Sequence, residues 1–314
     1  MPSQSVLKGS SKKVFAHYFT PFPLSFDNKA ESLDYYTRNY LTIDGESGKH
    51  AAYGGYLRDR PIARPVSTAS NWQLEDMKSE IRTATTAGLD GLTVDILSTS
   101  STSAHWTRVK LLIQAAAAVD PNFKIVLMPD MTTLTSGDST ELAARMAELA
   151  NLSSNVYRLG DGRLVVSPFY AEKQTAAWWA EFIAKMKTNH GIDVAFVPCF
   201  LSASNMSSFN SISYGFSNWG SRNPAQNQNL ANNINTAHSY GKIWMQPVSV
   251  QDERPSKGIF DEANNTENLR VTWQAAIDKG ADWIQITTWN DYSEGTQLAP
   301  SWRHGSAYLD LSSY

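Results

Sequence analysis

The feature that most constrains the fold of this chain is a series of eight apolar, β-branched-rich runs with helix-like segments between them. The runs are residues 12–19, 91–97, 124–130, 163–169, 193–200, 211–216, 242–249 and 282–289. They are nearly continuous, as expected of parallel strands buried on both faces. In the first intervening segment Leu74, Met77 and Ile81 keep helical spacing, and Gly88 follows as a helix stop. Eight such units predict a (β/α)8 TIM barrel.

The spacing of the runs also predicts the domain organisation. We expect a single catalytic domain over residues 1–314, with a flexible N-terminus at 1–11 and a long first βα loop at 20–70. A loop of that length in a compact domain is usually functional or a lid. A doubly wound nucleotide-binding sheet is disfavoured, because no glycine-rich phosphate loop follows any run.

Composition excludes several classes of function. The formal net charge of -3 gives no electrostatic case for nucleic acid or an anionic membrane, and no apolar run approaches the roughly 20 residues that cross a bilayer. The single cysteine, Cys199, rules out cysteine-cluster metal sites, and we interpret it as a small buried hydrophobe. The six histidines are scattered without a His-x-His pair, so we expect no metal and no cofactor.

The N-terminal residues bear on localisation. They lack the apolar core of a signal peptide, so any export signal is absent or was removed. We expect a secreted monomer, with a cytoplasmic location left open.

The strongest chemical signal lies at the end of the eighth run, in the segment TTWNDYSEGT at residues 287–296. Asp291 and Glu294 are three positions apart, so a helical turn would point both carboxyl groups the same way. Glycoside hydrolysis needs one carboxyl group that donates a proton and another that activates water or attacks the sugar. We predict Asp291 and Glu294 as this catalytic pair, with Glu294 as the acid and Asp291 as the base, although the spacing leaves their order open.

Other polar or aromatic residues stand near the ends of the runs, where barrel enzymes place their chemistry. Each could instead cap a helix, end a turn or pack in the core. The sequence DER at 252–254 is interpreted as a solvated surface of the seventh loop, and the alternative is that it closes a groove. The predicted substrate-binding residues are His17, Tyr18, Asp95, Asp130, Tyr170, Trp219, Gln246, Trp289, Asn290 and Tyr292.

From about residue 13 onward the chain resembles glycoside hydrolase family 71, the α-1,3-glucanases or mutanases. The matching segments are KVFAHYF, AGLDGLTVDIL, FKIVLMPDM, FVPCF, WMQPVS and WNDYSEG, in barrel order. The resemblance implies a (β/α)8 barrel that cleaves α-1,3-glucosidic bonds with inversion. It places the acid pair at Asp291 and Glu294, and it matches Asp95, Asp130 and His17 to positions at strand ends.

Three features depart from the fungal pattern of that family. Gly295 and Thr296 after the motif are similar to family 99 endo-mannosidases, the loop at 34–61 is unusually rich in tyrosine, and the β-sandwich extension is missing. We therefore expect a polysaccharide or oligosaccharide substrate, most simply α-1,3-glucan. A family-99-like glycosidase acting on α-mannan or another α-glycan, and a non-catalytic carbohydrate-binding barrel, remain as alternatives.

Overall fold

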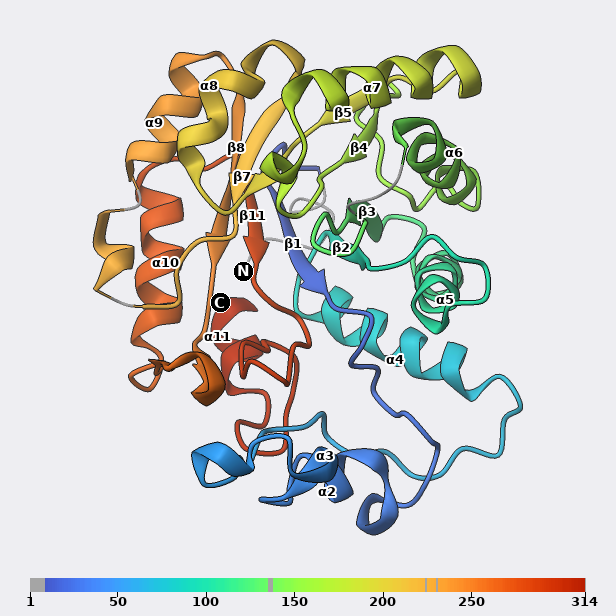
Figure 1. Cartoon of the computed structure of the whole chain (residues 1–314), viewed down its shortest axis with the longest axis vertical. Coiled ribbons are helices and arrows are strands. Elements are labelled where there is room, and N and C mark those ends of the chain that lie inside the picture. Colours follow the sequence, from blue (N-terminus) through green and yellow to red (C-terminus); the bar gives the residue numbers. More distant parts are fainter. Residues whose placement is uncertain (1–8, 135–137, 224, 230, 314) are drawn as a thin grey trace.

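The computed structural model describes residues 9–134, 138–223, 225–229 and 231–313, and over these it confirms the predicted (β/α)8 barrel. Its main sheet is parallel and has the order β5-β4-β3-β2-β1-β11-β8-β7-β6. Figure 1 shows helices surrounding these strands. The strands of the sheet are β1 (Lys13–Tyr18), β2 (Gly91–Ile96), β3 (Lys124–Pro129), β4 (Leu164–Val166), β5 (Val194–Phe196), β6 (Cys199–Phe200), β7 (Gly215–Asn218), β8 (Ile243–Val248) and β11 (Trp283–Ile286).

The barrel closes through β5 and β6, which are two halves of one strand. Only Val197 and Pro198 separate them, and proline has no N–H with which to continue a ladder. The Val197 N–H donates to Val166 O at 2.9 Å on one side, and the Ser217 N–H donates to Pro198 O at 2.9 Å on the other. The nine strand segments of the main sheet in the described residues therefore correspond to the eight strands of a barrel.

Helices connect the strands on the outside of the barrel. The segment predicted as helical around Leu74 lies in α4. Short 3-10 turns complete several of the connections. The α-helices outside the first loop are α4 (Trp72–Thr86), α5 (Ala104–Val119), α6 (Ser139–Ala150), α7 (Ala176–His190), α8 (Met206–Phe209), α9 (Ala231–Ser239), α10 (Glu267–Asp278) and α11 (Ala307–Ser313).

The two faces of each strand serve two separate cores. Side chains such as Phe15, Val126 and Trp283 fill the barrel interior, while Ala16, Ile284 and Ile286 pack outward against the helices. Because successive side chains in a strand point to opposite faces, only alternate residues can reach the inside of the barrel. This rule decides which of the predicted residues can line a site at the strand ends.

Two predicted segments differ in the structure, and a third lies mostly outside the described residues. The sixth strand is Gly215–Asn218 rather than 211–216, because residues 210–212 continue a 3-10 turn and the strand begins where Gly215 lies against Ile243. Residues 252–254 form β9 (Asp252–Arg254), which pairs antiparallel with β10 (Ile259–Asp261) as a hairpin after β8. Of the expected flexible N-terminus at 1–11, residues 1–8 lie outside the described residues.

The first loop is folded and packs against the loop after β11. It contains α2 (Tyr35–Asn39) and α3 (Gly45–Gly48), which lie at the bottom of Figure 1, toward the arrowheads of β1 and β11. Tyr36 packs on Tyr292 with ring centroids 6.1 Å apart. The Gln297 amide donates to Asp59 at 2.9 Å, which adds a polar contact between the two loops.

Within the described residues, no helix combines the length and the apolar character that crossing a membrane would require.

A buried ion pair in the first loop gives a stability prediction. Arg60 donates through both terminal nitrogens to Asp34 at 2.9 and 2.6 Å, and the Arg60 side chain is 1% exposed. We expect Asp34→Asn to lower the free energy of unfolding by about 3 kcal/mol, because it leaves a buried guanidinium without its counter-charge. Urea unfolding measures this change.

The matched control is Asp161→Asn, which removes the partner of Arg163 in an exposed pair. This change should cost much less than Asp34→Asn, because both members of the pair are largely hydrated before and after the substitution. Equal losses in the two variants would contradict the role given to the buried pair.

Candidate active site

A cavity of about 380 Å³ opens at the carboxyl ends of the barrel strands. Its polar lining includes six of the residues predicted from the sequence. The lining residues are His17, Phe19, Asp95, Asp130, Thr132, Phe169, Leu201, Trp219, Arg254, Asp291 and Glu294. The structure therefore brings the predicted acid pair into one space with a histidine, two further acids and several aromatic rings.

Asp291 is held by its own loop and is buried, with 6% of its surface exposed. Its Oδ1 accepts hydrogen bonds from the Ser293 N–H at 3.0 Å, the Ser293 hydroxyl at 2.7 Å and the Glu294 N–H at 3.2 Å. Burial raises the pKa of Asp291 to about 6, while these hydrogen bonds oppose the rise because they stabilise the carboxylate. The result is an acid that ionises just below neutral pH.

Glu294 lies three residues further along the same loop, and its side chain is 25% exposed. Burial is the largest cause that raises the pKa of Glu294 to about 7, and the nearby Asp291 carboxylate is the second. The Arg254 guanidinium opposes the rise from a distance of 3.1 Å between its Nη1 and Glu294 Oε1. The different environments of the two carboxyl groups thus give them different pKa values, about 6 and about 7. Such a difference allows one group to act as an acid while the other acts as a base.

The hairpin after β8 supplies charge to this pair. Asp252 is 3% exposed and accepts from Arg254 Nε at 2.7 Å. The interpretation of residues 252–254 as a solvated surface was therefore wrong for the buried Asp252, while Arg254 lines the cavity, as the groove-closing alternative allows. Arg222, which follows β7, is 4% exposed and also contributes positive charge near Glu294.

His17, Asp95 and Asp130 form a second polar group in the cavity. His17 Nε2 lies 3.6 Å from Asp95 Oδ1. Burial lowers the pKa of His17 to about 3 and raises the pKa of Asp95, with Asp130 adding to the Asp95 shift. Neither oxygen of Asp95 has a hydrogen-bond partner among the described residues, although Asp95 is 1% exposed. Such an unpartnered buried group is well suited to receive a ligand hydroxyl.

Asp130 is fixed by its own turn, and aromatic rings line the wall beside it. Asp130 Oδ1 accepts from the Thr132 N–H at 2.7 Å and the Thr132 hydroxyl at 2.6 Å. The Trp219 ring meets His17 edge-on at 4.9 Å and Phe169 at 4.8 Å. Flat apolar rings beside polar groups form a surface that suits a sugar ring, which also has apolar and hydroxyl-bearing faces.

Two predicted residues do not line the cavity because of strand alternation. Tyr18 follows the inward-facing His17, so its side chain points outward, and its hydroxyl donates to Glu80 at 3.0 Å. Gln246 lies between the outward-facing Trp244 and Val248, and its Oε1 accepts from Trp244 Nε1 at 2.6 Å. Both side chains therefore support the barrel from outside.

Four other predicted residues also lie outside the cavity lining. Trp289 donates through Nε1 to Glu80 at 3.3 Å, and Tyr292 packs on the first loop. Asn290 holds the start of the first loop through hydrogen bonds to Phe19 and Phe22. Tyr170 is half-buried beyond β4. We do not propose these four as substrate ligands.

Glu80 is a buried residue that the sequence analysis did not identify. It lies on α4, is 8% exposed, and accepts hydrogen bonds from Tyr18 and Trp289. It thereby joins the end of β1 to the loop that carries the acid pair. Glu80 lies three residues after Met77 and four before Ala84, so helical spacing places it on the buried face of α4, but that spacing does not reveal the partners of its carboxyl group.

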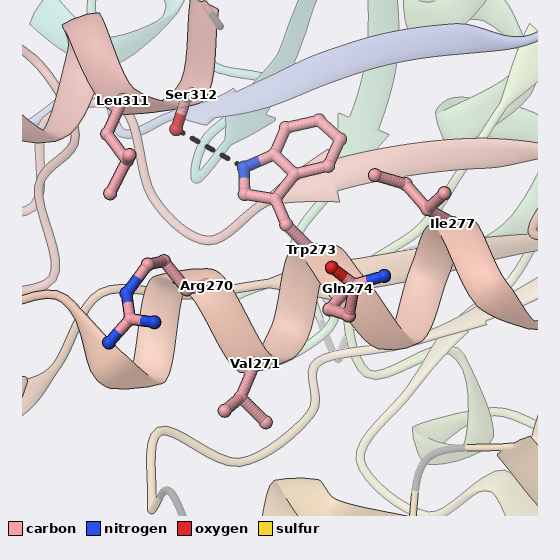
Figure 2. A pocket seen from close by; sticks show the side chains of 7 residues that line it. All are labelled: Arg270, Val271, Trp273, Gln274, Ile277, Leu311 and Ser312. Atoms are coloured by element: carbon pink, nitrogen blue, oxygen red, sulfur yellow. Dashed lines mark hydrogen bonds between the residues drawn. The ribbon is translucent and has the colours of Figure 1, made fainter.

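Another cavity of about 510 Å³ lies between α10 and α11 on the outside of the barrel (Figure 2). Its lining has no carboxyl group, and the Trp273 Nε1 donates to the Ser312 hydroxyl at 3.2 Å. The lining residues are Arg270, Val271, Trp273, Gln274, Ile277, Leu311 and Ser312.

Among the residues that the structure describes, no three His, Cys, Asp or Glu side chains are placed to share a metal ion. The cavity at the strand ends is therefore the candidate active site.

A parallel barrel with a buried and a half-buried carboxyl group in one cavity at its strand ends has the architecture of barrel enzymes that use acid and base catalysis. Comparison with known proteins identifies the family. Residues 65–310 match the family model described as glycosyl hydrolase family 71. Because this match covers most of the chain, the chain belongs to that family.

Curated relatives agree with the family. A glucan endo-1,3-alpha-glucosidase of Schizosaccharomyces pombe is 26% identical over 239 residues, which are 72% of this chain and 53% of the relative. A mutanase of Penicillium rubens is 26% identical over 251 residues, covering 77% of this chain and 53% of the relative. The ascus wall endo-1,3-alpha-glucanase of S. pombe is 23% identical, covering 74% and 55%. The chain thus spans about half the length of the curated relatives it matches.

Among solved structures, the fold is similar to that of the GH99 endo-alpha-mannosidase from Bacteroides thetaiotaomicron. The TM-score is 0.72, with 97% of this chain and 96% of that chain covered, and the sequence identity is 17%. The similarity supports the barrel architecture.

The burial of Glu80 predicts a pH dependence of stability. Burial raises the pKa of Glu80 from 4.5 to about 8. The folded state therefore holds this proton more tightly than the unfolded state, so the stabilisation is complete below about pH 4.5 and is lost as the pH rises through about 8. Between pH 5 and 8.5, the unfolding free energy of the parent should fall by roughly 2–4 kcal/mol more than that of Glu80→Gln.

Urea unfolding at the two pH values measures this difference. Glu181→Gln on α7 is the control, because its side chain is 55% exposed. Parallel pH profiles for the parent and Glu80→Gln would show that Glu80 is not the titrating group.

Proposed function

We propose that this chain is a glycoside hydrolase that cleaves α-1,3-glucosidic bonds of α-glucan. The observation that carries the proposal is the placement of Asp291 and Glu294 in one cavity at the end of the eighth strand. Membership of glycosyl hydrolase family 71 supports the reaction, and relatives named as a glucan endo-1,3-alpha-glucosidase and a mutanase support the linkage.

The environments of the two acids support different roles. Asp291 Oδ1 accepts three hydrogen bonds that stabilise a carboxylate, which leaves Oδ2 for a water molecule. Glu294 has the higher pKa, about 7, and is therefore the better proton donor near neutral pH. We infer that Glu294 is the general acid and Asp291 is the general base.

The reaction is then a single displacement. Glu294 donates its proton to the glycosidic oxygen as the bond from that oxygen to C1 breaks. Asp291 removes a proton from water while the water oxygen attacks C1 from the opposite face of the sugar. One water molecule is consumed, the configuration at C1 inverts, and both carboxyl groups must exchange a proton with solvent before the next cycle.

The remaining cavity residues are proposed to bind the substrate. Asp95 and Asp130 would accept or donate hydrogen bonds to sugar hydroxyls, and the neutral His17 can do the same from the first strand. Trp219 offers an aromatic face or edge to the sugar ring. One relative is named as an ascus wall glucanase, which indicates a substrate in a cell wall. We therefore infer that this enzyme acts outside the cell.

Removal of either acid tests the proposal directly. Asp291→Asn and Glu294→Gln should each lower kcat on α-1,3-glucan by about 10³-fold, because one variant loses the base and the other loses the acid. Both folds should survive, since burial already disfavours the charged form of each group. Release of reducing sugar and the thermal midpoint measure the two effects.

The exposed Glu181→Gln is again the control and should keep parental activity. Activity on an α-mannan but not on α-1,3-glucan would favour the alternative substrate. Glycan binding without reducing-sugar release by the parent would instead favour a non-catalytic barrel. Parental turnover in both acid variants would show that the assigned pair is wrong.

A further inference from the structure

Arg254 reaches the cavity from the β9–β10 hairpin and divides its nitrogens between two acids. Its Nε and Nη2 donate to the two oxygens of Asp252 at 2.7 and 2.5 Å. Its Nη1 lies 3.1 Å from Glu294 Oε1. The guanidinium is therefore anchored by two contacts on one side and touches the proposed acid through a single contact on the other.

This single contact between Arg254 and Glu294 opposes the role proposed for Glu294 as a proton donor. A general acid must carry a proton, whereas an adjacent guanidinium stabilises the ionised carboxylate and lowers its pKa. The conflict is removed if the contact between Arg254 and Glu294 is broken when the substrate is bound.

The surroundings of Arg254 permit such a change. The Asp252 side chain is 4% exposed, so the two contacts that hold the Arg254 guanidinium on Asp252 are buried. The Arg254 side chain is 32% exposed and lines the cavity, so a sugar hydroxyl can reach Nη1. The backbone is fixed as well, since the Glu253 N–H donates to Glu294 O at 2.7 Å. Because the guanidinium is planar and stays held on Asp252, the contact would break by rotation of the Glu294 side chain away from Nη1, and the hairpin need not move.

Other charges around Glu294 stay in place during this change. Asp291 on the same loop and Asp252 on β9 both favour a proton on Glu294, and the His17 ring on β1 is neutral. Arg222 after β7 is buried, and its Nη1 donates to Gly220 O at 3.1 Å rather than to a carboxylate. Arg254 is thus the cation in direct contact with Glu294 that a ligand in the cavity can reach.

We propose that Arg254 is a displaceable counterion of Glu294, which it contacts in the structure and releases when a glycan hydroxyl binds its Nη1. The inference rests on the proposed function and adds a substrate-dependent step to it. Glu294 takes up one proton from solvent as the glycan binds, and that proton is the one later donated to the glycosidic oxygen. No other bond is made or broken in this step.

Proton uptake on binding tests the proposal without turnover. The probe is a thio-linked α-1,3-gluco-oligosaccharide, whose sulfur bridge resists hydrolysis. Calorimetric titration at pH 7.5 in phosphate and in Tris, which differ in ionisation enthalpy, reports the protons exchanged. The parent protein should take up a fraction of a proton, at most about three quarters, because Glu294 with a pKa of about 7 is only roughly one-quarter protonated at pH 7.5 and its pKa rises when the counterion leaves.

Two variants sharpen the test. Arg254→Gln keeps an amide that can donate to Asp252 but carries no charge toward Glu294, so its proton uptake should fall to a small fraction of the parental value. Lys257→Gln, at an exposed position on the same hairpin, removes a charge away from the cavity and should leave the uptake unchanged.

The pH dependence of turnover gives a second readout. In the parent, the alkaline limb of kcat should lie at higher pH than the limb of kcat/KM, because the first reports the complex and the second the free enzyme. In Arg254→Gln the kcat/KM limb should move up to meet the kcat limb.

Binding of the probe with equal proton exchange in parent and Arg254→Gln would overturn the counterion role alone. Failure of the parent to bind the probe would overturn the proposed substrate and this inference together.

Discussion

The structure depends on keeping two carboxyl groups, one buried and one half-buried, three residues apart on one short loop. In water both would be ionised near neutral pH, and neither could donate a proton efficiently. Burial raises both pKa values, to about 6 for Asp291 and about 7 for Glu294. The three hydrogen bonds to Asp291 Oδ1 then separate the two acids by stabilising only one carboxylate. The chemistry proposed for the cavity follows from this difference in environment.

The rest of the molecule holds that loop in place. Asn290 fastens it to the end of β1, and Glu80 reaches it through the indole of Trp289. The first loop supports it from the other side through Tyr36 and Tyr292. These contacts explain why several aromatic and amide residues of the eighth-strand motif face away from the cavity. They position the acids, and their side chains are not available to a sugar.

The parts of the fold and of the site that depend on the local order of apolar and polar residues could be predicted from the sequence. The barrel followed from eight apolar runs, and the positions of Asp291 and Glu294 followed from one crowded segment at a strand end. Strict alternation would also have separated His17 from Tyr18, because neighbours in a strand cannot both face the barrel interior. The same rule would have placed Gln246 outside.

The charges that modulate the acid pair could not be predicted in this way. Asp252 and Arg254 are about forty residues before Glu294, and they approach it only because a hairpin folds over the barrel end. Glu80 comes from α4, more than two hundred residues before Trp289. Contacts across such separations depend on the packed three-dimensional fold, and local spacing carries no record of them.

The most direct test of the central claim is NMR of the anomer first released when the protein is incubated with insoluble α-1,3-glucan. Inversion by the Asp291 and Glu294 pair predicts that the new reducing ends appear first as the β-anomer and then mutarotate. Initial release of the α-anomer would contradict the single-displacement mechanism, and release of no sugar would contradict the proposed activity itself.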